Sequence, residues 1–204
     1  MVDCSTNPKL IEDYRSYKIE VIALADTYIF KVVVAGAGGV GKTALVQRYC
    51  TGTFSEDHKM TIGAAFSMKQ VILDSGENVK MQLWDFAGEE RFRFVLGDYC
   101  KGSSGAIVCY DITDYATFQQ IPEWLRIIRT SAGMIPIVLV GTKFDLPGHE
   151  VDLPTADKYA DDAKLIMNVW CSSKLDVNIE PIFSAIAKWL IYFVKNPQYY
   201  PGAG

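Results

Sequence analysis

The chain has 204 residues, half of them apolar, which is enough for one well-buried core and too short for two ordinary domains. Its 24 acidic and 20 basic residues give a formal net charge of −4, so the overall charge does not favour DNA or RNA as a partner. No apolar run approaches the ~20 residues that span a bilayer, no signal peptide is evident, and the five cysteines form no CxxC pair. We therefore expect a cytoplasmic protein.

Residues 1–27 form an N-terminal extension ahead of the first predicted strand. Apolar side chains in and just after it recur at three- and four-residue spacing, which predicts an amphipathic helix: Leu10, Tyr14, Tyr17, Val21, Leu24 and Tyr28. Two interpretations stay open, a segment lying on the protein's own surface or one that contacts a partner or a membrane. The segment carries charges of both signs, with no basic cluster to hold it on anionic lipid.

From Ile29 on, short apolar runs alternate with longer amphipathic stretches, which is typical of strands joined by crossover helices in a largely parallel sheet. Between Phe66 and Trp84 the polar turn 74–77 is too short for a helix, so these two strands should form an antiparallel hairpin. The predicted sheet is therefore mixed and six-stranded. Its other strands are 29–35, 106–110, 137–140 and 167–171.

Helices are predicted by a period of three to four residues. Pro122 suits the first turn of one helix, and Asn178 is a plausible N-cap of the last one. The apolar faces are Phe118, Ile121, Leu125 and Ile128 in the first case, and Ile179, Ile182, Phe183, Ile186 and Leu190 in the second. Both helices should pack on the sheet.

A phosphate-binding loop is predicted at residues 36–43, GAGGVGKT, which fits the pattern GxxxxGK[ST] between a strand and the helical stretch 44–50. Its backbone N–H groups and the helix N-terminus would surround the phosphates, Lys42 would reach the β- and γ-phosphates, and the Thr43 hydroxyl would ligate Mg²⁺. Kinases, ATPases and GTPases share this loop, so alone it indicates only a nucleoside triphosphate. The predicted phosphate-binding residues are Gly38, Gly39, Val40, Gly41, Lys42, Thr43 and Ala44.

The hairpin's second strand is followed by Asp85-Phe86-Ala87-Gly88. Asp85, at the carboxyl end of a strand, could hold Mg²⁺ through water, and Gly88 could offer its backbone N–H to the γ-phosphate. Thr61 lies in a polar loop and is the candidate for a second hydroxyl ligand of Mg²⁺ when a γ-phosphate is bound. Hydrolysis would then release two loops at once, which is the behaviour of a switch.

Two motifs at the carboxyl ends of later strands predict the base: Thr142-Lys143-Phe144-Asp145 and Ser172-Ser173-Lys174. The Asp145 carboxylate can accept hydrogen bonds from guanine N1–H and from the exocyclic amine, whereas adenine offers neither donor on that edge. The Lys143 stem would lie along the base, the Ser173 N–H would donate to guanine O6, and Phe54 would flank the other side. The candidate base-binding residues are thus Phe54, Thr142, Lys143, Asp145, Ser172, Ser173 and Lys174.

In order and spacing these motifs resemble the five G motifs of the Ras superfamily. The segment 90–93 and the segment 110–114 are most similar to the Rab branch, whereas Thr142 in place of the usual asparagine is similar to the Rho branch. The resemblance implies an α/β P-loop GTPase fold over residues 28–196, with a mixed, mostly parallel six-stranded sheet, five helices on its two faces and a short tail at 197–204. It also implies GTP and GDP with Mg²⁺ as ligands.

The implied activity is hydrolysis of GTP to GDP and phosphate, by a switch whose loops at about 54–63 and 85–100 bind effectors, an exchange factor and a GTPase-activating protein. The implied catalytic residues are Lys42, Gly88 and Glu89. An ATP-using P-loop kinase is disfavoured, because the chain shows no arginine-rich lid segment.

Three features depart from the family pattern. Glu89 stands where a glutamine usually orients the attacking water; it could orient water itself, leave hydrolysis slow until a partner supplies an arginine, or stay uninvolved. A hydrolysis-deficient GTP/GDP-binding module is therefore the alternative function. His58 and Met60 replace a common tyrosine and proline, so the first switch should close differently. No cysteine follows Cys171, so we expect no covalent lipid anchor, and contact with membranes only through a partner or residues 1–27.

Overall fold

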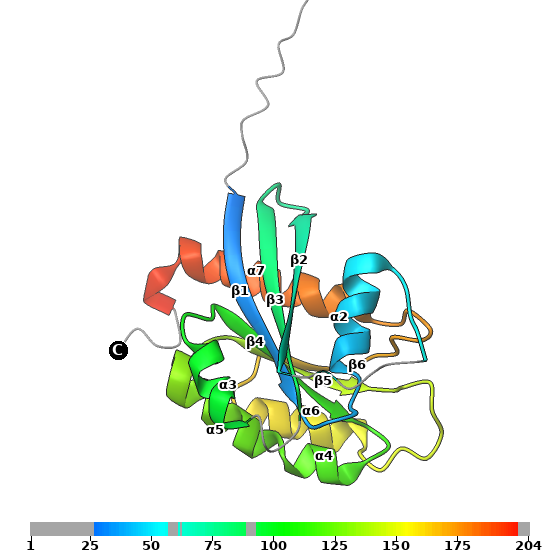
Figure 1. The fold of residues 1–204 in the computed structure, drawn as a ribbon. Coiled ribbons are helices and arrows are strands. Elements are labelled where there is room, and N and C mark those ends of the chain that lie inside the picture. The colour runs from blue at the N-terminus through cyan, green and yellow to red at the C-terminus, as the bar shows by residue number, and fades with distance from the viewer. Residues whose placement is uncertain (1–26, 57–60, 62, 89–92, 200–204) are drawn as a thin grey trace, which may run out of the picture.

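A computed structural model describes residues 27–56, 61, 63–88 and 93–199 (Figure 1). The predicted helix of the N-terminal extension, His58, Met60 and Glu89 lie outside the described residues. Of the predicted C-terminal tail, the described part is the 3₁₀ helix η2 (Pro197–Tyr199).

The described residues form one six-stranded sheet in the order β2-β3-β1-β4-β5-β6. Every neighbouring pair is parallel except the β2–β3 hairpin, so the predicted mixed, mostly parallel sheet is confirmed. The central strands β4 and β5 are buried along their whole length because helices cover both faces. The strands are β1 (Thr27–Gly36), β2 (Ala64–Ile72), β3 (Asn78–Phe86), β4 (Gly105–Asp111), β5 (Ile137–Thr142) and β6 (Met167–Trp170).

Helices lie on both faces of the sheet, as predicted (Figure 1). One apolar core lies under α2 (Lys42–Thr51) and α7 (Ile179–Lys195). The other lies under α3 (Arg93–Cys100), α4 (Tyr115–Gln119), α5 (Ile121–Ala132) and α6 (Leu153–Asp162). Among the described residues no helix is long and apolar enough to cross a bilayer.

Two helix predictions need correction. The described chain has six α-helices rather than five, because α4 ends at Gln119 and α5 starts at Ile121. Pro122 lies in the first turn of α5, as predicted, and it has no N–H to continue a hydrogen-bond ladder from α4. Asn178 is the N-cap residue of α7, as predicted, but its side chain makes no capping hydrogen bond; its backbone is left-handed (φ 58°) and its side-chain amide donates to the Trp170 carbonyl at 2.7 Å.

The buried cysteines behave as core residues. Cys100, Cys109 and Cys171 are at most 1% exposed, and no disulfide joins them. Burial raises the pKa of the Cys100 thiol to about 11, so this thiol stays protonated and unreactive at neutral pH.

Candidate nucleotide-binding site

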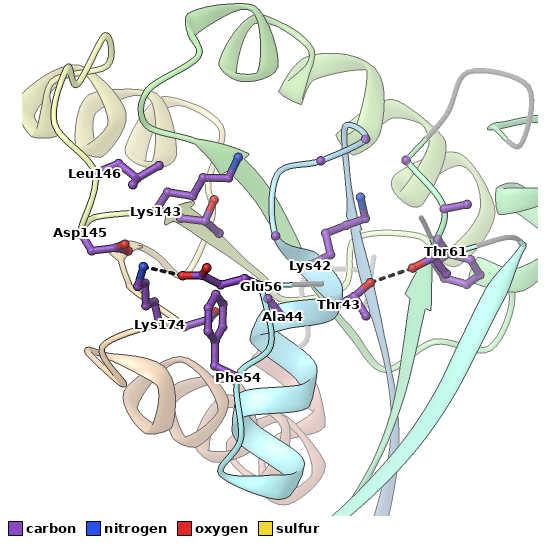
Figure 2. A pocket seen from close by; sticks show the side chains of 18 residues that line it. Lys42, Thr43, Ala44, Phe54, Glu56, Thr61, Lys143, Asp145, Leu146 and Lys174 are labelled. Atoms are coloured by element: carbon purple, nitrogen blue, oxygen red, sulfur yellow. Dashed lines mark hydrogen bonds and ion pairs between the residues drawn. The ribbon is translucent and has the colours of Figure 1, made fainter. Parts of the chain in front are cut away.

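A cavity of about 370 Å³ opens at the carboxyl edge of the sheet (Figure 2). Lys42, Thr43 and Thr61 lie at one end of it, and Lys143, Asp145 and Lys174 at the other. We call them the phosphate end and the base end, after the motifs predicted for them. The structure thus brings the predicted phosphate and base motifs to one cavity. Its lining residues are Gly38, Gly39, Gly41, Lys42, Thr43, Ala44, Phe54, Glu56, Thr61, Phe86, Ala87, Gly88, Thr142, Lys143, Asp145, Leu146, Ser173 and Lys174.

Three residues predicted to bind nucleotide or metal are not among the lining residues. Val40 contributes a carbonyl that accepts a hydrogen bond from Thr142, and Ser172 donates to Asp145. Asp85 is 2% exposed and lies behind Thr43, from which it accepts a hydrogen bond. Each of the three residues therefore forms a hydrogen bond with a lining residue and holds it in place.

The phosphate loop turns between β1 and α2 with very little room around its backbone. A Cβ atom added at Gly36 (φ 139°) would lie 2.2 Å from the Cys109 carbonyl oxygen on the neighbouring strand β4. One added at Gly88 would lie 2.3 Å from the Ala37 carbonyl carbon, so the loop after β3 packs directly on the phosphate loop. Gly41 precedes α2 without any side-chain cap, which leaves the first amides of the helix available to an anion.

Lys42 is a cation held inside the protein, with 5% of its surface exposed. Its ammonium group donates to the Gly36 carbonyl at 2.8 Å and to the Ala37 carbonyl at 2.6 Å, across the loop. Burial lowers the pKa of Lys42, and the nearby Asp85 carboxylate opposes that shift. A buried ammonium beside backbone amides is an arrangement that binds phosphate.

Three oxygen-bearing side chains meet at the end of the cavity that holds Lys42. The Thr43 hydroxyl donates to Asp85 Oδ2 at 2.5 Å and lies 2.8 Å from the Thr61 hydroxyl, which must therefore be the donor of that second bond. Hydroxyl and carboxylate oxygens are the hard donors that Mg²⁺ prefers, so this group fits the ion. Among the described residues no cluster of three His, Cys, Asp or Glu offers an alternative metal site.

At the base end, Asp145 is oriented by Ser172. The buried Ser172 hydroxyl donates to Asp145 Oδ1 at 2.6 Å and accepts from the Leu175 N–H at 3.0 Å. The single proton of this hydroxyl is used by Asp145 and its position is held by the Leu175 N–H, so it fixes the carboxylate in the lining of the cavity. Asp145 is thereby presented to a ligand with its hydrogen-bonding edge in a defined direction.

Lys143 turns its ammonium group away from the cavity. Its backbone is left-handed (φ 63°), and its Nζ lies 2.5 Å from Asp111 Oδ2. Burial alone would raise the pKa of the Asp111 carboxyl, but hydrogen bonds from Lys143 and Thr113 outweigh it and hold this pKa below its ordinary value. The ammonium group of Lys143 is thus paired with Asp111, and the aliphatic part of its side chain is left to line the cavity.

Thr142 joins the two ends of the site. Its buried hydroxyl lies 2.5 Å from the Val40 carbonyl of the phosphate loop and 2.9 Å from the Tyr110 carbonyl at the end of β4. The single hydroxyl proton is shared between the two carbonyls. Thr142 therefore bonds to the backbone of the site, whereas the sequence had indicated a candidate base-binding residue in place of the usual asparagine.

Arg48 and Glu56 belong to the site but were missed in the sequence. Arg48 donates to the carbonyls of Ser173 at 2.6 Å and Lys174 at 3.0 Å, and its guanidinium lies 6.0 Å from the centre of the Phe54 ring. Glu56 forms an exposed ion pair with Lys174 at 2.7 Å (Figure 2). Nothing in the sequence separates Arg48 from an ordinary basic residue in the last turn of a helix, because its partners lie more than a hundred residues away.

The fold and the cavity define a P-loop nucleotide-binding protein of the small GTPase class. The sequence model of the Ras family matches residues 31–191. The chain is 38% identical over 166 residues to the human Ras-related protein Rab-19, covering 80% of this chain and 76% of that one. It is also 38% identical over 162 residues to Rab-1A of Dictyostelium discoideum, covering 78% and 79% of the two chains, and 37% identical over 165 residues to Rab-1 of Theileria annulata, covering 80% and 74%. The chain belongs to the Ras family, in its Rab-like branch, and is a small GTP-binding switch GTPase.

Proposed function

We propose that the cavity binds GTP and GDP, with the phosphates at the Lys42 end and guanine at the Asp145 end. The observation that carries this proposal is the hydrogen bond from Ser172 to Asp145, with Ser172 itself held by the Leu175 N–H, since a carboxylate held in this way offers acceptors that match the N1–H and amine of guanine. Lys143 and Phe54 would flank the base, and the Ser173 N–H would donate to O6. Mass analysis of nucleotide that co-purifies with the protein tests this assignment, and adenine nucleotide alone would refute it.

GTP hydrolysis would take place at the Lys42 end of the cavity. Water would attack the γ-phosphate in line with the leaving oxygen, while Lys42, the phosphate-loop amides and the Gly88 N–H stabilise the charge that develops on the phosphate oxygens. Thr43 and Thr61 would hold Mg²⁺, with Asp85 behind them through water. The ion, when bound, neutralises charge on the β- and γ-phosphate oxygens.

The identity of Glu89 favours a second candidate function. A glutamate can accept a proton from water, but it cannot donate an amide hydrogen bond to the phosphate, and its charge is repelled by the phosphate oxygens. The alternative is a GTP/GDP-binding module that barely hydrolyses GTP without a partner's arginine. Single-turnover GTP hydrolysis separates the two: a rate equal to that of a Lys42→Ala control would leave only the binding module.

The region over residues 28–196 is proposed as the GTPase domain, with loops 54–63 and 85–100 as switches for effectors, an exchange factor and a GTPase-activating protein. The hydroxyl contact of Thr61 with Thr43 supports a loop that responds to the phosphate end of the cavity. Hydrogen exchange tests the switches directly. Amides in both loops should exchange more slowly with a non-hydrolysable GTP analogue than with GDP, and equal rates would contradict the proposal.

A further inference from the structure

The exposed side of α7 carries a cluster of aromatic rings near its carboxyl end. Trp189 and Tyr192 have ring centres 5.7 Å apart, both rings contact Phe193, and Tyr192 stacks on Tyr199 of η2 at 6.2 Å. Trp189 is 41% exposed, Tyr192 42% and Tyr199 61%. We call Trp189, Tyr192 and Tyr199 the α7 aromatic surface. An apolar surface of this kind on a water-facing helix indicates a binding site.

The N-terminal extension enters the fold beside this surface. Thr27 starts β1 and pairs with Asn78 of β3. Glu77, which precedes Asn78 in the turn before β3, forms an ion pair with Lys195, the last residue of α7. Tyr28 packs against the same apolar core that α7 covers. Thr27, to which the N-terminal extension is joined, therefore lies near the end of α7 that carries the aromatic rings.

The spacing of apolar residues in the extension suits packing against a single helix. Leu10, Tyr14, Tyr17, Val21 and Leu24 alternate four and three residues apart, which is the narrow stripe of helix pairs rather than a broad apolar face. The exposed side of α7 has a matching row, in which half-buried Ala185 is followed by Trp189 and Tyr192 at the same spacing. Two apolar rows of one period can interlock along their length.

Length and charge are also compatible with this pairing. At about 1.5 Å per residue a helix over residues 10–26 would be about as long as the 17-residue α7. The 26 residues before Thr27 carry five acidic and three basic side chains, which disfavours an anionic membrane as the alternative partner. We propose that residues 10–26 form a helix that docks along α7 of the same molecule and covers the α7 aromatic surface, with Tyr17, Val21 and Leu24 against Trp189 and Tyr192.

Hydrogen exchange of the full-length, GDP-loaded protein tests this docking. Amides of residues 10–26 should be protected, and Tyr192→Ser should raise their exchange rate by about tenfold, the change expected for the loss of one aromatic contact. Tyr115→Ser is the matched control, because Tyr115 is also 42% exposed but lies on α4, over the other face of the sheet. Unchanged exchange of β1 and β4 amides would show that both variants keep their fold.

The reciprocal experiment uses the extension. Val21→Asp should increase acrylamide quenching of Trp189, measured as the difference between each protein and its Trp189→Phe derivative. Unprotected amides in residues 10–26, or protection that Tyr192→Ser leaves unchanged, would overturn the proposal. Protection that rises with protein concentration would also overturn it, since the α7 aromatic surface would then bind a second copy of the chain.

Discussion

The two ends of the cavity are held in different ways. At the phosphate end, the loop is held through its backbone: Lys42 donates to carbonyls five and six residues before it, and Gly36 lies directly against the backbone of β4. At the base end, the contacts are long-range, since Arg48 reaches carbonyls 125 and 126 residues away. The phosphate end therefore depends on close packing of backbone around a glycine-rich loop, whereas the base end depends on side-chain hydrogen bonds between α2 and the loop after β6.

Because the two ends of the cavity are held differently, substitutions at each end should impair the protein for different reasons. Changes at the phosphate end should disturb backbone packing and hence stability. Changes at the base end should alter which nucleotide binds, and how long it stays, while the fold persists. The following substitutions test this division, from the largest expected effect to the smallest.

Asp145→Asn should change base preference most strongly. Guanine would lose two charge-assisted hydrogen bonds, each worth about 1.5–3 kcal/mol, so affinity for GDP should fall by about a thousandfold. Xanthine nucleotides, which present a carbonyl in place of the amine, should gain affinity. Competition binding with GDP and XDP measures both changes, and unaltered preference for GDP would show that another residue selects the base.

Gly36→Ala should reduce stability by about 3 kcal/mol, because a Cβ atom there meets the backbone of Cys109 and no side chain can move aside. Gly76→Ala is the matched control, since Gly76 also has a positive φ (94°) but a Cβ atom there meets nothing within 4 Å. Urea unfolding of the two variants isolates the cost of the close approach. Equal losses would mean that φ alone, rather than the contact with β4, decides this position.

Arg48→Gln should release the loop that carries Ser173 and Lys174. Loss of charge-assisted hydrogen bonds to two carbonyls should weaken GDP binding by roughly 2 kcal/mol, about thirtyfold, mainly through faster dissociation. Arg48→Lys should recover only part of the loss, since an ammonium group cannot reproduce the fork of the guanidinium. Arg126→Gln is the control, because Arg126 is exposed and pairs only locally with Glu123 on α5.

Thr142→Val removes the one side-chain hydroxyl that we find linking the phosphate loop to β5. Two carbonyls would lose their donor in a buried site, so we expect a loss of about 1 kcal/mol in urea unfolding, with Thr142→Ser close to the parent protein. A similar loss in the serine variant would attribute the effect to the methyl group. The dissociation rate of GDP, measured on the same samples, reports whether the link also matters to binding.

Glu56→Gln should have the smallest effect, because the ion pair with Lys174 is exposed. We expect GDP dissociation to accelerate by a factor of about two at low ionic strength and not at all in high salt. Asp98→Asn is the control: Asp98 is also exposed and pairs with Lys101 at the same distance of 2.7 Å, but away from the cavity. A salt-independent change would indicate that the side chain contacts the nucleotide itself.

The features that could be predicted from the sequence are those that local pattern encodes. The apolar runs gave the strands of a mixed, mostly parallel sheet, and the short polar turn 74–77 gave its single antiparallel hairpin. The roles of Asp145 and Thr61 stay predictions, although the structure brings both to the cavity. The helix predicted over Phe118 to Ile128 starts only at Ile121, with Pro122 in its first turn as predicted, and Phe118 belongs to the separate short helix α4.

By itself, the sequence determined the fold class and the positions of the phosphate and base motifs, since burial period and loop chemistry act over a few neighbouring residues. Only the tertiary structure decided that Arg48 bonds to the loop after β6, that Thr142 joins the phosphate loop to the end of β4, and that the side chain of Asn178, the N-cap residue of α7, bonds to β6 rather than to the helix. Each of these hydrogen bonds depends on how two distant segments are placed by the core between them. A side chain's own sequence neighbours do not specify that placement.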